Sequence, residues 1–168
     1  MNYTQQIDYQ HSLRDMLTVY PADFFVTANF NAPELSYAAA KNRLKRFHAI
    51  VDHKLLGKHW SQPNDRRTDF VAVPETKCDK LHYHMLWRIP DEPQDCQFRY
   101  CAPVWFRNKI APGGSLDIQP LADRRALADY LTKDCYKQES IDNYFFSSEF
   151  VKAADALVSS NACSSHVD

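Results

Sequence analysis

The stretch LHYHMLWRI, residues 81–89, decides how this 168-residue chain folds. It is rich in aromatic and apolar residues, and its length is typical of a β-strand. Side chains alternate between the two faces of a strand, so the odd-numbered residues, all apolar or aromatic, leave one face together. His82 and His84 leave the other face, with Cα atoms roughly 7 Å apart. Two imidazoles on one face of a strand that otherwise reads as buried require an explanation.

This strand has a partner immediately before it in the sequence. TDFVAVPE, residues 68–75, also has a β-strand pattern, and the short TKCDK turn joins the two into an antiparallel hairpin. Pro74 has no N–H to donate to a ladder, so the first strand is expected to lie at a sheet edge or to end there. The hairpin brings the carboxylate of Glu75 beside the two histidines.

Upstream, DFFVTANFN, residues 23–31, predicts a strand, and a short helix is expected around His11 to Val19. A longer helix is predicted from Pro33 and Glu34 to Gly57. Its apolar residues recur at three- and four-residue steps, whereas Lys41, Lys45 and His48 fall on a different face. The apolar stripe consists of Ala40, Leu44, Phe47, Val51 and Leu55.

Downstream, residues 90–110 form an amphipathic stretch that is expected to be partly helical. The PGG at 112–114 is a clear break. SLDIQPL, residues 115–121, alternates as a fourth strand does. Residues 122–137 predict a helix with Asp123 as its N-cap.

The predicted order is β-α-β-β-α-β followed by one more helix. This order predicts an α+β fold of the ferredoxin-like or RRM-like, split-βαβ type. In that arrangement an antiparallel sheet carries helices on one face and leaves the other for an active site. We expect one domain over residues 1–152, with its core at 23–137, and a flexible tail at 153–168.

The composition limits the functional class. Lys and Arg total 20 against 21 Asp and Glu, yet eight basic residues lie between Lys41 and Arg67, opposed only by Asp52 and Asp65. A local basic patch suggests an anionic partner, although a solvated helix face explains it equally well. The five cysteines form no CxxC pair and are expected to be free thiols in a reducing compartment. With no apolar run long enough to span a membrane and no signal-peptide core, the protein is expected to be cytoplasmic.

Glu75, His82 and His84 together form a candidate metal site. Neutral imidazole is a common ligand for transition metals, and two imidazoles with one carboxylate leave coordination positions open for a substrate. Such a site suits Mn²⁺ or Mg²⁺ acting as a Lewis acid. The alternative is a pair of half-exposed strand histidines that bind no metal, because the HxH pattern alone is short.

The YLTK stretch supplies a second constellation. Tyr130 and Lys133 are three residues apart and therefore neighbours on a helix surface. A phenol beside an ammonium group is a candidate nucleophile with a charge partner, and an amphipathic tyrosine at the core edge is the alternative. Tyr136 lies roughly 120° further around the helix, so we expect a single nucleophile, Tyr130, with Tyr136 as the fallback.

Taken in order, the FFVTANF strand, the Glu75…His82-Tyr83-His84 cluster and the YLTK helix resemble the HUH endonucleases. That superfamily includes the nuclease domains of rolling-circle replication initiators and, more distantly, relaxases and single-tyrosine transposases. The resemblance covers about residues 23 to 137. It implies metal-dependent, sequence-specific nicking and joining of single-stranded DNA through a 5′-phosphotyrosine on Tyr130, with Lys133 either orienting the phosphate or lowering the cost of the phenolate. A single-tyrosine transposase and a non-catalytic nucleic-acid-binding module on the same fold are the alternatives.

By the same resemblance, other residues are candidates for contact with DNA. The implied partner is single-stranded DNA, with a hairpin origin and a host helicase as further candidate partners. No GxxxxGK[ST] motif occurs, so we expect either a stand-alone nuclease or an excised domain. Trp60, Trp105 and Phe106 are candidate stacking platforms for bases, and burial in the core is the preferred interpretation of the two tryptophans. The polar candidates are Thr27, Asn29, Asp117 and Gln119. They would contact the substrate or support the metal ligands, and ordinary polar residues on the sheet surface are the alternative. The basic candidates for contact with the DNA backbone are Lys41, Arg43, Lys45, Arg46, Arg66 and Arg67.

Overall fold

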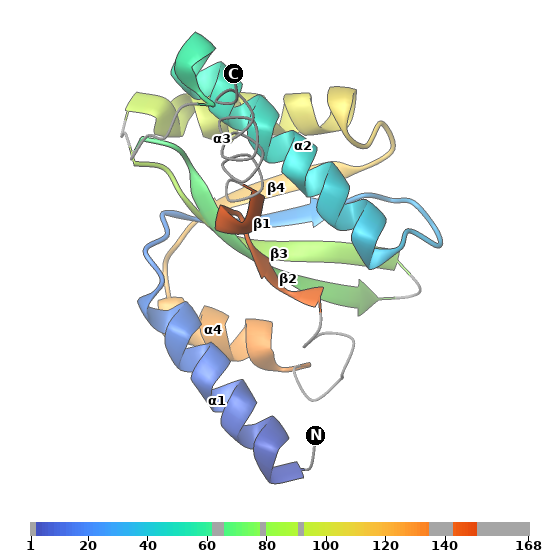
Figure 1. The fold of residues 1–168 in the computed structure, drawn as a ribbon, viewed down its shortest axis with the longest axis vertical. Coiled ribbons are helices and arrows are strands. Elements are labelled where there is room, and N and C mark those ends of the chain that lie inside the picture. The colour runs from blue at the N-terminus through green and yellow to red at the C-terminus, as the bar shows by residue number, and fades with distance from the viewer. Residues whose placement is uncertain (1–2, 62–65, 78–79, 91–92, 135–142, 151–168) are drawn as a thin grey trace, which may run out of the picture.

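The computed structural model describes residues 3–61, 66–77, 80–90, 93–134 and 143–150 (Figure 1). Five strands in these ranges form one antiparallel sheet in the order β4-β1-β3-β2-β5. The α+β class is confirmed, and the order of β1, α2, β2, β3, α3 and β4 is compatible with the predicted ferredoxin-like fold. The elements are α1 (Tyr3–Val19), β1 (Phe24–Asn29), α2 (Tyr37–Leu56), the 3₁₀ turn η1 (Gly57–His59), β2 (Asp69–Lys77), β3 (Lys80–Arg88), α3 (Pro93–Lys109), β4 (Ser115–Pro120), α4 (Arg124–Thr132) and β5 (Phe145–Phe146).

The main core lies between the sheet and helices α2 and α3. Alternation along β3 works as predicted, since Tyr83, Met85 and Trp87 are all fully buried on this side. The Trp87 ring stacks on Phe70 at a centroid distance of 4.4 Å and meets Phe47 of α2 edge-on at 5.8 Å. The predicted apolar stripe of α2 is therefore what binds this helix to the sheet.

Helices also cover part of the other sheet face, which the sequence had left free for the active site. Figure 1 shows α1 and α4 on the side of the sheet away from α2 and α3. Val71 and Leu86 are apolar on this face, and they form a second, smaller core with Leu13 and Leu17 of α1 and Leu131 of α4. Exposed apolar side chains on a sheet favour a covering element, and α1 supplies it.

The element boundaries differ from expectation in places with a clear physical cause. Helix α2 begins at Tyr37 and not at Pro33, because Glu34 has a left-handed backbone (φ 59°) and Ser36 is the N-cap, accepting from the N–H of Ala39. Helix α2 ends before Gly57, as predicted. Helix α1 is longer than expected and begins at Tyr3. Helix α4 has the predicted Asp123 N-cap but ends at Thr132, and the tail expected from residue 153 lies outside the described residues.

Two other predictions concern β2 and α2. Strand β5 pairs with β2 only at Val71 and Ala72 within the described ranges, so Pro74 lies where β2 is the outer strand, as expected. The placement of His48 on a polar face of α2 is wrong, because its side chain is buried. Its Nε2 lies 3.0 Å from the carbonyl oxygen of Thr68, just before β2, so the buried face of α2 is wider than its apolar stripe.

The structure also bears on the predictions about membrane-spanning segments and cysteines. Among the helices of the described ranges, none combines the length and the apolar character needed to cross a membrane. Cys96 and Cys101 are free thiols, as predicted. The other three cysteines lie outside the described residues.

Candidate metal centre

The β2–β3 hairpin brings the three predicted metal ligands together. Glu75 is directly opposite His82 in the ladder, and His84 leaves the same face of β3 two residues later. Glu75 Oε2 lies 3.0 Å from His82 Nε2 and 2.6 Å from His84 Nε2. One ligand atom from each of the three residues lies within 4.8 Å of the others. The predicted cluster is thus a possible metal-binding triad in the folded chain.

Glu75 is a stable anion. Burial alone would raise its pKa, but hydrogen bonds from Lys133, His84 and His82 outweigh burial and hold the pKa of Glu75 well below its usual range. Lys133 Nζ donates to the second carboxylate oxygen, Oε1, at 2.7 Å. Burial would lower the pKa of Lys133, yet its hydrogen bonds to Glu75 and Tyr130 raise the pKa instead. The centre therefore combines a carboxylate with a fixed ammonium group.

The ring of His84 is held on two sides by β1. The Thr27 hydroxyl lies 3.0 Å from His84 Nδ1, and the two residues are direct neighbours in the β1–β3 ladder. Phe25 stacks on the same imidazole at a centroid distance of 5.4 Å. Burial, opposed by the hydrogen bond to Glu75, lowers the pKa of His84, so the ring is neutral at neutral pH. Neutral imidazole with one nitrogen held by a hydrogen bond is the form that binds metals.

The donor set fits a divalent ion. In an octahedral shell at about 2.1 Å, two adjacent ligand atoms are about 3 Å apart. Glu75 Oε2 lies at 2.6 and 3.0 Å from the two imidazole nitrogens, which is close to that separation. The three side chains can therefore act as ligands of one ion without a large backbone movement.

Helix α4 places a tyrosine at the edge of this centre. The hydroxyl of Tyr130 lies 3.2 Å from Glu75 Oε2 and 3.5 Å from His84 Nε2. Lys133 Nζ lies 3.8 Å from the centroid of the Tyr130 ring, as the three-residue spacing predicts. Tyr130 keeps 40% of its surface exposed, so a ligand can reach it from solvent. Tyr136, the fallback nucleophile, lies outside the described residues.

A polar row continues from the centre along β1 and β4. Thr27 is paired with Asp117 of β4, and Asn29 with His82 of β3, so these side chains share the face of the triad. Asn29 Oδ1 accepts from the backbone N–H of Asn31 at 2.9 Å, and Gln119 Nε2 donates to Asp117 Oδ2 at 2.7 Å. All four side chains therefore have partners in the fold, and Asp117 and Gln119 are exposed.

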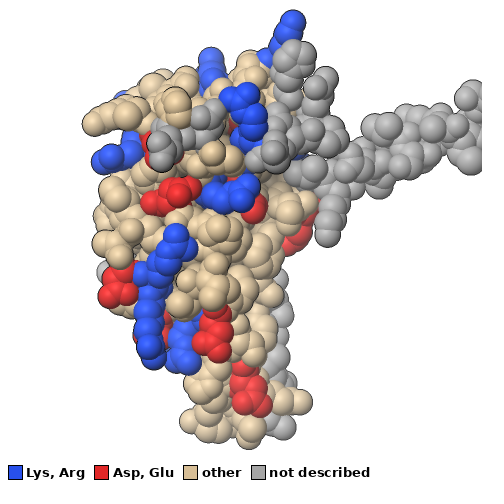
Figure 2. Space-filling view, turned by 90° about the vertical axis from the view of Figure 1, so that its left-hand side faces the viewer, with Lys and Arg blue, Asp and Glu red and all other residues tan. Residues whose placement is uncertain are grey.

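The basic candidates are not beside the triad. Helix α2 packs on the opposite sheet face, so Lys45 and Arg46 are exposed away from the metal centre. Lys41 pairs with Glu149 at 2.8 Å, and Arg67 pairs with buried Asp52 at 2.9 Å. On the side of the molecule that Figure 2 shows, Lys and Arg side chains are interspersed with Asp and Glu. Contact of these residues with DNA, with Arg43 and Arg66 among them, stays a prediction.

The aromatic candidates divide into two kinds. Phe106 is wrong as a stacking platform, because it is fully buried against Phe30 and Phe47 in the main core. Trp60 and Trp105 are half-buried and keep part of their rings at the surface. Sequence reasoning missed Phe25 as the support of His84, although strand alternation places it on the face of Thr27.

Comparisons of the chain with protein-family models, with curated proteins and with solved structures gave no match.

Proposed function

We propose that this protein is a metal-dependent enzyme that nicks and rejoins single-stranded DNA, with Tyr130 as its covalent nucleophile. The observation that carries the proposal is the convergence of two independent elements. The β2–β3 hairpin supplies a two-histidine, one-carboxylate ligand set, and the hydroxyl of Tyr130 from α4 lies 3.2 Å from its carboxylate. The smaller core packs α4 on the hairpin through apolar residues, but that packing does not require a tyrosine hydroxyl beside a carboxylate and two imidazoles, so their convergence favours a chemical role.

Phosphodiester transfer explains each component. A bound divalent ion, Mn²⁺ or Mg²⁺ by its ligand set, would supply Lewis-acid stabilisation of the charge that grows on the phosphate oxygens. The Tyr130 oxygen attacks phosphorus and forms a P–O bond while the bond from phosphorus to the 3′ oxygen breaks. The phenolic proton passes to solvent water, and the departing 3′ oxygen takes a proton from solvent water and leaves as a hydroxyl. The products are a 5′-phosphotyrosine and a free 3′-OH, and attack by a 3′-OH reverses the step.

Lys133 acts on the nucleophile. Its ammonium group lies over the Tyr130 ring and is held there by Glu75, and a nearby cation lowers the cost of the phenolate. The resemblance of the three motifs to the HUH endonucleases supports DNA as the substrate. The open position of Tyr130 suits a substrate as large as a strand of nucleic acid.

A covalent-adduct assay tests the proposal. Purified protein is incubated with a fully randomised, labelled single-stranded DNA library and Mn²⁺, and denaturing gels separate protein-linked DNA. We expect an adduct with wild type that is absent with EDTA, absent in Tyr130→Phe and strongly reduced in Glu75→Gln. Tyr100→Phe is the matched control, because Tyr100 is 74% exposed on α3, and it should form adduct as wild type does.

Two outcomes would contradict the proposal. One is the absence of any adduct from the randomised library in Mn²⁺. The other is an adduct that survives Tyr130→Phe, and its loss in Tyr136→Phe would then identify the residue that acts instead.

A further inference from the structure

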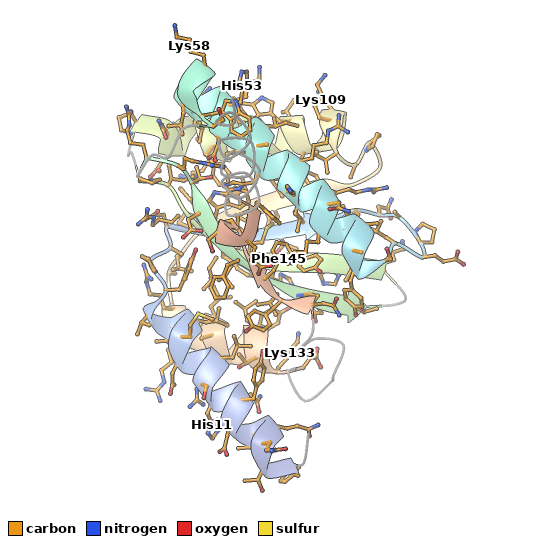
Figure 3. The ribbon with its side chains drawn as sticks, in the orientation of Figure 1. His11, His53, Lys58, Lys109, Lys133 and Phe145 are labelled. Atoms are coloured by element: carbon orange, nitrogen blue, oxygen red, sulfur yellow. The ribbon has the colours of Figure 1, made fainter. Side chains whose placement is uncertain are left out.

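A concave site lies between helices α2 and α3, on the side of the sheet opposite the metal centre. It is a hollow of about 460 Å³, a size within the usual range for sites that hold a small ligand or one nucleotide. Figure 3 shows His53 and Lys109 at this end of the molecule, far from Lys133 beside the metal centre. The nicking chemistry proposed above makes no use of this hollow.

The interior of the hollow is apolar and aromatic. Trp60 follows η1 and Trp105 belongs to α3, and both line the hollow together with Ala49 and Ile50 of α2. Both indoles are half-buried, so each is held by packing but keeps ring surface at the site. The guanidinium of Arg67 lies 5.7 Å from the Trp60 ring centroid and helps to hold that ring in place. Held indole rings at a surface are platforms on which unpaired bases stack.

The rim of the hollow is basic. Arg46, His53 and Lys54 of α2 and Lys109 of α3 line it and are exposed, and no acidic residue lines it among those that the structure describes. Arg46, Lys54 and Lys109 form no ion pair with any described residue. The one acid of α2, Asp52, is fully buried and pairs with Arg67. Within the part of the chain that the structure describes, these three cations around an apolar hollow have no anionic partner, and they suit an anionic group of a ligand.

We infer that the α2–α3 hollow is a second binding site for single-stranded DNA, which takes one base against Trp60 and Trp105 and the adjacent phosphates on Lys54, Lys109 and Arg46. This inference rests on the proposed function for its choice of DNA as the strand. A flat apolar surface beside cations matches a nucleotide, whose base and phosphate need both features. An acidic peptide would use the cations and leave the two indoles unexplained.

Intrinsic fluorescence tests the site without any nicking. The chain has three tryptophans, and Trp87 is fully buried, so quenching by a bound base reports Trp60 and Trp105. The full-length protein in EDTA is titrated with an oligothymidylate of about 10 nucleotides. We expect saturable quenching, with a Kd at least about fivefold weaker in Trp105→Leu and in Trp60→Leu.

Charge variants complete the test and do not disturb the core. In Lys109→Gln and Lys54→Gln, the slope of log Kd against log salt should fall by about 0.7, the value for one lost phosphate contact on a single strand. Arg107→Gln is the matched control, because Arg107 is an exposed cation in the last turn of α3 that does not line the hollow. It should keep the slope of wild type.

Several outcomes would overturn the inference. These are an absence of quenching, equal effects of Lys109→Gln and Arg107→Gln, or binding of polyglutamate with the same dependence on Lys54 and Lys109. Binding of oligouridylate but not oligothymidylate would overturn DNA as the occupant. If the quenching behaves as expected but the protein forms no covalent adduct, DNA binding at the hollow stands and the nicking function is rejected. If a covalent adduct forms but the expected quenching is absent, only DNA binding at the hollow is rejected.

Discussion

Thr27→Val should weaken metal binding through His84 without touching a metal ligand. Beside the Glu75 carboxylate, which can only accept, His84 Nε2 carries the proton, and its Nδ1 accepts from the Thr27 hydroxyl at 3.0 Å. When Nε2 binds a metal, the proton moves to Nδ1, which then donates to the same hydroxyl oxygen. A threonine hydroxyl can donate to Nδ1 in one tautomer and accept from Nδ1–H in the other. Valine has nearly the same shape but can form neither hydrogen bond.

The expected magnitude follows from this geometry. The side chain of His84 is 9% exposed, so water cannot readily replace the lost partner of Nδ1. Loss of such an outer hydrogen bond typically costs 10- to 100-fold in metal affinity. The metal-free protein also loses a hydrogen bond, which offsets part of that cost. We therefore expect about a tenfold weaker Kd for Mn²⁺, or about 1.4 kcal/mol.

Titration of Mn²⁺ with detection of the free ion by electron paramagnetic resonance measures this Kd directly. Thr27→Ser is the matched control, since it keeps the hydroxyl, and it should bind within about twofold of wild type. Glu75→Gln, which removes a ligand charge, should bind more weakly than either variant. Equal Kd values for wild type and Thr27→Val would refute the reasoning, because they would mean that the Thr27 hydroxyl does not hold the metal-binding form of the ring.

Two further predictions concern Asp52 and His48, the buried polar residues of α2. Asp52 is fully buried and accepts from Arg67 and from the N–H and hydroxyl of Thr68, so Asp52→Ala should lower the free energy of unfolding by about 3–5 kcal/mol. Urea unfolding measures this free energy. The control Asp15→Ala, at an exposed position, should unfold within about 0.5 kcal/mol of wild type. A loss as small as that in Asp52→Ala would contradict the stabilising role of the hydrogen bonds to Asp52. Burial lowers the pKa of His48, although Asp52 opposes the shift. Below about pH 6.5, His48 therefore binds a proton in the unfolded chain but not in the folded chain. The free energy of unfolding consequently falls as the pH falls. His48→Gln should lose about 1 kcal/mol less stability than wild type between about pH 7.5 and about pH 5.5, and parallel losses would show that another group is responsible.

The triad was predictable because it depends on short-range rules. Alternation along a strand is strict, so His82 and His84 had to share a face. The turn between the two strands is short, so the register that places Glu75 opposite His82 follows from the hairpin itself. The N-cap of α4 at Asp123 was predictable for the same reason, because it depends on residues close in the sequence.

What the sequence could not predict depends on contacts between distant segments. His48 reads as polar on a helical wheel, but Thr68, just before β2, and Phe70 of β2 cover it. Phe106 reads as a candidate base platform, and only the packing of α3 on Phe47 shows it to be core. The late start of α2 depends on the left-handed backbone at Glu34, which no residue preference predicts for a glutamate.

The unexpected length of α1 explains how the nucleophile is held. Helix α4 spans only nine residues, which is too short to be stable in isolation. Gln10 Nε2 of α1 donates to the carbonyl oxygen of Thr132 at 2.8 Å, and the two helices share the smaller core over Leu17 and Leu131. The metal ligands belong to the sheet, which the main core holds rigidly, whereas Tyr130 belongs to this separate layer. The gap between the triad and the Tyr130 hydroxyl is therefore set by the packing of α1, so a cavity at Leu17 should disturb the nucleophile while leaving the three ligands in place.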